Sequence, residues 1–307
     1  MSAGGGIVLG ESGLCDPTAP LTASGNLRRR MVVNGVVRLT ATLAALAAVA
    51  ILAIIVYDVI VRGASSLSLS FVTQTPQGLA AGGIFNFLAG TLIVVALGAV
   101  VALPLGILTG LYLTEFAGPR SRVASLLKLA LDVMQGLPTI VVALFIYGLI
   151  VIPAHRESGL AASLALAIIM LPLMARASQE VLLLVPNSLR EAADALGVNR
   201  WRTVLTVILP SAIGGIATGA ILAIARAAGE TAPVLILDSL YGQNNTTFNI
   251  LHGVPTVPML IYSSVDLPIP DAVTRAWGAS LVLMAMILLA NIGARVMLAR
   301  SRAKMGR

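Results

Sequence analysis

Two side chains of opposite charge, Arg226 and Glu230, lie four residues apart inside a long apolar stretch that reads ILAIARAAGETAP. A guanidinium group presents a planar fork of N–H donors that matches the oxygen atoms of a tetrahedral oxyanion. A carboxylate on the same helix face can orient that fork or disfavour permanent capture of the anion. The residue types and their spacing therefore predict a substrate path for an anion, formed by Arg226 and Glu230.

A structural interpretation of the same pair stays open, in which Arg226 and Glu230 only neutralise each other. Arginine before glutamate is the less favourable order for an ion pair along a helix. A charged residue in the middle of a membrane span costs roughly 2.5–3.5 kcal/mol, so it should face the bundle interior or a water-filled path. The two interpretations can hold in different conformational states.

The element that carries this pair must be one of several membrane-spanning helices. Hydrophobic residues make up 58% of the 307 residues and charged residues only 11%, whereas soluble domains carry about a quarter charged residues. A span needs about 20 mainly apolar residues in helical form. We therefore expect an all-α membrane protein with about six transmembrane helices, at 36–61, 85–113, 126–152, 160–184, 204–237 and 272–298.

The net charge of +7 comes from cations at the ends of these spans, so it indicates no nucleic-acid partner. With the N-terminus inside, 16 of the 20 Lys and Arg residues fall on the cytoplasmic side, and only Arg62, Arg156 and Arg275 fall outside. Arg226 is the one left over. This asymmetry predicts a multi-pass protein of the cell membrane, plasma or inner, with both termini in the cytoplasm.

Composition divides the chain into further segments. The only cysteine, Cys15, can form no internal disulfide and lies in a Gly-rich leader. The stretch 238–271 contains four prolines, so we expect an irregular external loop there. The expected segments are a disordered cytoplasmic leader at 1–30, an N-terminal transmembrane helix at 31–62, an external segment at 63–84, a core at 85–295 and a basic cytoplasmic tail at 296–307.

The longest cytoplasmic connection predicts a pair of helices. Ser188 and Glu191 have the spacing of a capping box, which would start a short helix at Ser188. Gly197 stands where a left-handed residue would end that helix, and Asn199 can cap the next one. A solvated connector is the alternative, and the apolar side chains of Leu196 and Trp201 argue against it.

The same segment resembles the permease subunits of bacterial ATP-binding-cassette importers of type I, through EAA at 191–193, Gly197 and Leu-Pro at 209–210. The resemblance implies a core of five helices, with the helix at 36–61 added before it. It also implies that the stretch 186–200 holds the coupling helix that docks on a separate ATPase, through Glu191, Ala192, Ala193, Leu196 and Gly197.

The run ARAAGETAP at 225–233 is similar to the phosphate importer permeases called PstA, as are shorter runs: GTL at 90–92, PLG at 104–106, YLTE at 112–115 and GLPTIV at 136–141. This resemblance implies that Arg226 belongs to a phosphate path supported by Glu230. It implies a PstC-like permease, a PstB-like ATPase dimer and a PstS-like phosphate-binding protein as partners. The chain has no Gly-rich loop ending in Lys and Ser or Thr, so we expect a non-catalytic subunit without cofactor or metal.

The same residues leave other functions open. Permeases for sulfate or molybdate share the coupling helix but lack the GETAP run. An ATP-independent secondary transporter would use Arg226 and Glu230 as its coupling site, and a non-transporting assembly protein would use the pair only for structure. Copurification of an ATPase distinguishes an importer from the last two. Pro104, Pro138 and Pro172 are either hinges or fixed kinks.

Overall fold

The computed structural model describes residues 27–78, 81–118, 120–238, 249–265 and 267–305. Most of the expected leader, with Cys15, lies outside these residues. The chain divides into two compact units with a boundary after Tyr57. The first unit is the greater part of the helix α1 (Leu27–Gly63), which is long and apolar enough to cross a bilayer. The helix begins four residues before the N-terminal span that we expected at 31–62.

The second unit begins with the end of α1 and with the segment expected outside the membrane. This segment contains short elements: the 3₁₀ turn η1 (Ala64–Ser66), the helix α2 (Leu69–Thr73) and the paired strands β1 (Pro76–Gln77) and β2 (Ala81–Gly82). Arg275 is buried behind the strands and donates to the carbonyl oxygens of Gly78 and Gly83 at 3.2 and 2.8 Å. The segment is therefore attached to the last span by the Arg275 guanidinium group and by the Ser66 hydroxyl, which donates to the carbonyl oxygen of Thr274 at 3.0 Å.

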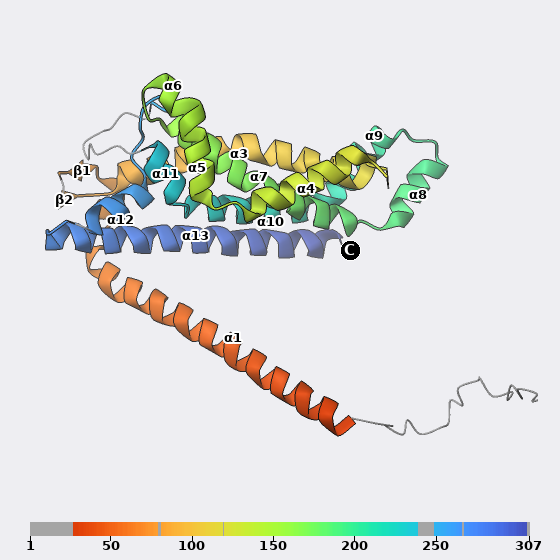
Figure 1. The fold of residues 1–307 in the computed structure, drawn as a ribbon, viewed down its shortest axis with the longest axis horizontal. Helices are drawn as coiled ribbons and strands as arrows, with labels where there is room; N and C mark the ends of the chain where they lie inside the picture. Colours follow the sequence, from red (N-terminus) through yellow and green to blue (C-terminus); the bar gives the residue numbers. More distant parts are fainter. Residues whose placement is uncertain (1–26, 79–80, 119, 239–248, 266, 306–307) are drawn as a thin grey trace, which may run out of the picture. The chain divides into compact units, whose positions relative to one another are not determined.

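Four long helices of the second unit qualify as spans (Figure 1). They are α3 (Phe85–Leu111), extended by the π-helical turn η2 (Tyr112–Phe116); α7 (Gly159–Leu183); α10 (Leu209–Ala228), preceded by α9 (Arg200–Thr203) and η4 (Val204–Ile208); and α13 (Pro270–Met305). The helices α3 and α7 pack closely, because Gly106 and Gly110 leave room for Met174 and Ser178. The expected tail at 296–307 continues α13 as far as Met305.

The third expected span, 126–152, is not one straight helix. It is broken into α4 (Arg122–Gly136) and a second part made of α5 (Thr139–Ile146), η3 (Tyr147–Val151) and α6 (Ile152–Ala154), with a bend of 104°. Proline forces the preceding residue out of the helical region, and Leu137 has an extended ψ of 132°. The described residues thus contain five spanning helices, or six if the bent pair is one span, which confirms an all-α membrane protein with about six spans.

Two expectations for the next part of the chain are wrong. The expected span 204–237 ends at Ala228, where Gly229 closes α10, and a separate short helix α11 (Ala232–Leu237) follows. The loop 238–271, expected to be irregular, contains the helix α12 (Val257–Val265). Pro258 lies in the first turn of α12, where its missing N–H breaks no hydrogen bond. Residues 239–248 and 266 of this loop lie outside the described part.

Candidate substrate path and coupling site

Arg226 lies in the last turn of α10, and Glu230 follows the end of that helix. The Nε atom of Arg226 is 3.8 Å from Oε1 of Glu230, which makes a loose ion pair, longer than a hydrogen bond. Because α10 stops at Ala228, Glu230 lies beyond the helix, and the two residues do not share one helix face as the sequence predicted. The Arg226 side chain is 60% exposed in the isolated chain, and that of Glu230 is 17% exposed.

A pocket of about 170 Å³ opens beside Arg226. Its wall comes from both sides of the break between α4 and α5, with Gln135 before the bend and Thr139 after it, and from α7, with Pro172 and Leu173. Gln135 donates to the carbonyl oxygen of Pro172 at 3.5 Å. The sequence predicted a hinge or a fixed kink at Pro138 but not a complete break, and this break brings the two parts of the bent pair to the pocket.

The chemistry of the pocket suits an anion. Among the described residues that line it, Arg226 is the charged one, and the Gln135 amide and the Thr139 hydroxyl add hydrogen-bond donors. The remaining walls are apolar, which lowers the local dielectric constant and strengthens the field of the guanidinium group. The arrangement can bind an oxyanion without covalent chemistry.

An ion pair that the sequence analysis missed lies next to this pocket. Asp132 in α4 pairs with Arg176 in α7, and Arg176 also donates to Oε1 of Gln179 at 3.2 Å. Asp132 precedes Gln135 by three residues, and Arg176 follows Pro172 by four, so each lies on the pocket-lining face of its helix. This helical spacing was the available signal, but Arg176 was counted only as a cation at a span end.

The predicted helix pair is present. The helix α8 (Asn187–Ala195) begins one residue before Ser188, and Pro186, which lacks a side-chain acceptor, stands at its cap. The predicted capping box is therefore wrong. Gly197 ends α8 with a φ of +68°. The Gly197 N–H donates to the backbone carbonyl oxygen of Asp194, and the Val198 N–H donates to that of Ala193. These two hydrogen bonds form a Schellman motif.

The second helix of the pair starts as expected, because Oδ1 of Asn199 accepts from the Trp201 N–H at 3.2 Å. The residues expected to dock on an ATPase lie mostly at the surface of α8 and its turn. Glu191, Ala192, Leu196 and Gly197 are exposed, Leu196 to 81%. Ala193 is buried, so it packs against the protein itself.

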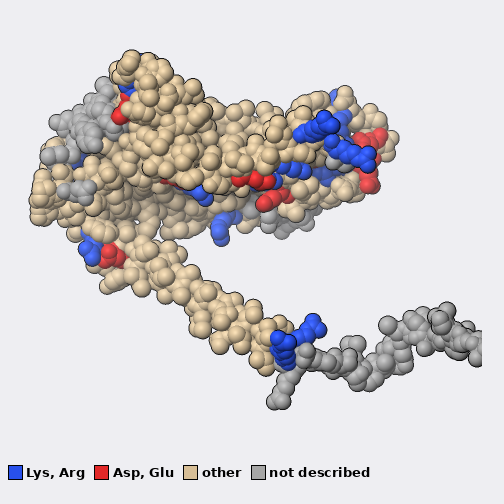
Figure 2. All heavy atoms as spheres, in the orientation of Figure 1, with Lys and Arg blue, Asp and Glu red and all other residues tan. Residues whose placement is uncertain are grey.

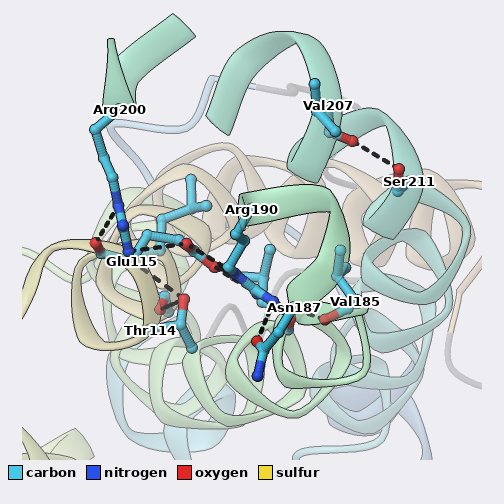
Figure 3. A network of polar contacts seen from close by, with 11 residues as sticks. Thr114, Glu115, Val185, Asn187, Arg190, Arg200, Val207 and Ser211 are labelled. Atoms are coloured by element: carbon cyan, nitrogen blue, oxygen red, sulfur yellow. Dashed lines mark hydrogen bonds and ion pairs between the residues drawn. The ribbon is translucent and has the colours of Figure 1, made fainter. Parts of the chain in front are cut away.

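A buried carboxylate holds this helix pair, as Figure 3 shows. The Glu115 side chain, at the end of the π-helical turn η2, is 0% exposed. Its Oε1 accepts from Nη2 of Arg190 at 2.8 Å, and its Oε2 lies 3.5 Å from Nη2 of Arg200. The Glu115 carbonyl oxygen also accepts from Nε of Arg200 at 2.9 Å.

Arg190 also has hydrogen-bond partners other than Glu115. It donates to the carbonyl oxygens of Leu182 and Val185, at 2.9 and 2.6 Å, and to Oδ1 of Asn187 at 3.1 Å. The Leu182 carbonyl lies in the last turn of α7, where it also accepts from the Val185 N–H at 3.2 Å, and the Val185 carbonyl lies just beyond that helix. In the sequence, Glu115 was part of the YLTE run and Arg190 was one of the counted cytoplasmic cations. Their contact was not predicted, because 75 residues separate them.

Basic side chains gather at the end of the second unit that carries α8 and α9 (Figure 2). In this region Arg120 and Arg122 precede or begin α4, and Arg200 and Arg202 belong to α9. The cation bias in the sequence thus corresponds to one end of the folded unit.

Comparisons with known proteins identify the family of the chain. Residues 102–305 match the family described as "Binding-protein-dependent transport system inner membrane component". The "Phosphate transport system permease protein PstA 1" of Mycobacterium tuberculosis (strain CDC 1551 / Oshkosh) is 41% identical over 70% of each chain. The "Phosphate transport system permease protein PstA" of Xylella fastidiosa (strain 9a5c) is 34% identical over 92% of this chain and 98% of its own.

A solved structure shares the fold. The inward-facing MetNI methionine ABC transporter has a chain with a TM-score of 0.54 and 19% identity, covering 71% of this chain and 94% of that one. The chain therefore belongs to the family of inner membrane components of binding-protein-dependent transport systems, and to the PstA-type permeases within it.

Proposed function

We propose that this chain is the permease subunit through which an ATP-driven importer moves inorganic phosphate into the cytoplasm. The observation that supports this proposal most directly is the position of Arg226 in the wall of the pocket beside the break between α4 and α5. The relatives that match over most of the chain are named for phosphate transport. Phosphate is a tetrahedral oxyanion, and the guanidinium fork of arginine suits its geometry and charge.

Arg226 is the residue we assign to the phosphate path, with Glu230 as its support. Their separation of 3.8 Å is too long for a firm hydrogen bond, so Arg226 keeps donors for a ligand. Its exposed side chain would be costly against lipid. A PstC-like permease that completes a heterodimer on this face would remove that cost and close the path.

The energy for transport would come from another subunit. The exposed Glu191, Ala192, Leu196 and Gly197 offer a docking surface for a PstB-like ATPase dimer, with Ala193 packed beneath them. ATP binding would close the ATPase and pull α8 inward, the spans would open outward, and hydrolysis would restore the inward-facing state. The chain itself would be non-catalytic, with no cofactor of its own.

The cation bias supports an orientation with both termini and α8 in the cytoplasm. The segments at 63–84 and 238–271 would then face outward, where a PstS-like protein delivers phosphate. The proposed division of the chain is a leader at 1–30, an added helix at 31–62, the transport core at 85–295 with the coupling region at 186–200, and a basic tail at 296–307.

Phosphate uptake by Arg226→Ala tests this function. In proteoliposomes holding the complete transporter, we expect at least a tenfold loss of phosphate uptake, since no other cation lines the described part of the pocket. Arg156→Ala, which removes an exposed cation elsewhere, is the matched control and should leave uptake unchanged. The uptake of sulfate and of molybdate by the parent transporter is measured in the same way.

Three results would contradict the proposal. Unchanged phosphate uptake by Arg226→Ala would refute the role of this residue. A parent that prefers sulfate or molybdate would reassign the substrate. Phosphate uptake that persists without the ATPase subunit would instead indicate a secondary transporter.

A further inference from the structure

The end of α3 is attached to both helices of the cytoplasmic pair. The two oxygen atoms of the Glu115 carboxylate face Arg190 of α8 and Arg200 of α9, on either side of the turn at Gly197. Next to this contact, the ring of Phe116 lies 4.6 Å from that of Trp201. The pair α8–α9 therefore cannot rotate away from α3 without separating charged groups and a ring contact.

We propose that Glu115 is the positioning residue that makes α8, α9 and the end of α3 move as one body. A shift of α8, imposed by the ATPase, then reaches the spans directly. This inference rests on the proposed function, because it assigns how the docking helix drives transport.

The burial of Glu115 is what makes this attachment strong. Its side chain is 0% exposed, and that of Arg190 is 16% exposed, so water cannot replace the lost partner if the pair opens. Exposed ion pairs contribute little, whereas removal of one member of a buried pair leaves an uncompensated charge. Arg200, which is 45% exposed, is the weaker of the two partners.

The shift has a continuous route to the pocket. Arg190 binds the carbonyl oxygens at the end of α7 as well as Glu115. The helices α3 and α7 are in close contact, since a Cβ atom on Gly106 would lie 2.7 Å from Cβ of Met174. Pro172 of α7 belongs to the same wall as Arg226. Tightly packed helices shift as units, so movement of α8 displaces this wall.

A role in stability alone makes a different prediction from a role in coupling. If Glu115 only stabilised the fold, its loss would reduce the amount of assembled transporter. The phosphate moved per ATP hydrolysed by the surviving complexes would stay at the parental value. The ratio of transport to hydrolysis is therefore the decisive measurement.

The first variant is Glu115→Gln, which removes the charge and keeps the side-chain volume. In the complete transporter in proteoliposomes, we expect ATP hydrolysis to persist and the phosphate moved per ATP to fall at least tenfold. Glu180→Gln is the matched control, because Glu180 is an exposed acid on α7, and its ratio should equal the parental one. A parental ratio in Glu115→Gln would overturn the inference.

The second variant, Glu115→Asp, covers the case in which Glu115→Gln does not assemble. It keeps the negative charge and shortens the side chain by one methylene group, so both arginines retain a counterion at a longer distance. We expect assembly with a ratio that is severalfold below the parental one. An assembled Glu115→Asp transporter with the parental ratio would also overturn the inference.

A distance measurement tests the same point without reference to the transported anion. Spin labels are placed at Leu108 on α3 and Ala195 on α8, in a Cys15→Ser background. We expect one distance in the parent with and without ATP, and a broader distribution in Glu115→Gln. A parental distance that changes with ATP would contradict movement as one body. If the parent moves no phosphate, the proposed function fails, and this measurement still decides the role of Glu115.

Discussion

The Nε atom of Arg226 lies 3.8 Å from Oε1 of Glu230, across the point where α10 ends. The backbone N–H of Glu230 donates to the carbonyl oxygen of Ala227, so the residue after the helix is held in place. The backbone of Glu230 is therefore held next to Arg226, and we expect its carboxylate to compete with an anion that approaches the guanidinium group.

Removing this competitor should strengthen anion capture and slow release. We expect Glu230→Gln to retain more phosphate in the purified complex and to reduce the maximal rate of uptake. A partly exposed ion pair contributes about 0.2–1 kcal/mol, which corresponds to a change of up to about fivefold. Equilibrium binding of labelled phosphate and uptake rates measure the two effects. Weaker binding in Glu230→Gln would show that the carboxylate orients the guanidinium group for the anion and does not compete with it.

At Gly197, the turn between α8 and α9 should require only a backbone conformation with positive φ and no particular side chain. Its φ is +68°, and a Cβ atom there would meet nothing within 4 Å. The left-handed conformation costs a residue with a Cβ about 1–2 kcal/mol, and asparagine tolerates it best. We expect Gly197→Ala to lower the midpoint of thermal unfolding and the uptake rate, and Gly197→Asn to preserve both. Equal losses in the two variants would point to the side chain and not to the backbone.

The contact between α3 and α7 should tolerate no added atoms. A Cβ atom on Gly106 would lie 2.7 Å from Cβ of Met174, and a backbone nitrogen lies next to it at 3.1 Å. Overpacking of this kind costs about 1–3 kcal/mol. We expect Gly106→Ala to lower the thermal midpoint in detergent. Gly293→Ala is the control, since a Cβ on Gly293 in α13 has open space around it; comparable losses in both variants would exclude the packing explanation.

The parts predictable from sequence are those that composition and local spacing determine. Apolar runs predicted the spans, and Gly197 and Asn199 predicted the end of one helix and the start of the next. At Pro138 a kink was predicted but a complete break of the helix was not, because a proline inside an apolar run indicates either one. The end of α10 at Gly229 was hidden in the same way, since the apolar residues continue on both sides.

The contacts of the site needed the folded chain. Glu115 lies 75 residues from Arg190 and 85 from Arg200, and no local pattern relates residues so far apart. Arg176 and Asp132 are likewise 44 residues apart. The cations at the span ends could be assigned to a side of the membrane by number, but their individual partners follow only from the packing of α3, α4 and α7.

Asp238 directly follows α11, outside the helices that qualify as spans. Its Oδ1 accepts from the Val254 N–H at 2.6 Å, and the residue is fully buried. Burial raises the pKa of Asp238 from 3.8 to about 8, while the Val254 N–H lowers it and the nearby charge of Glu157 raises it. Between about pH 4 and pH 8 the folded chain therefore binds a proton that the unfolded chain has released.

The free energy of unfolding should consequently fall as pH rises through this window. We expect the thermal midpoint of the parent to be higher at pH 5.5 than at pH 7.5. Asp238→Asn stays neutral and keeps an acceptor for Val254, so it should lose most of this dependence and gain stability at pH 7.5. Asp271→Asn, at an exposed acid near the start of α13, should keep the parental dependence. If Asp238→Asn followed the parental curve, the buried carboxyl would not be the group that titrates.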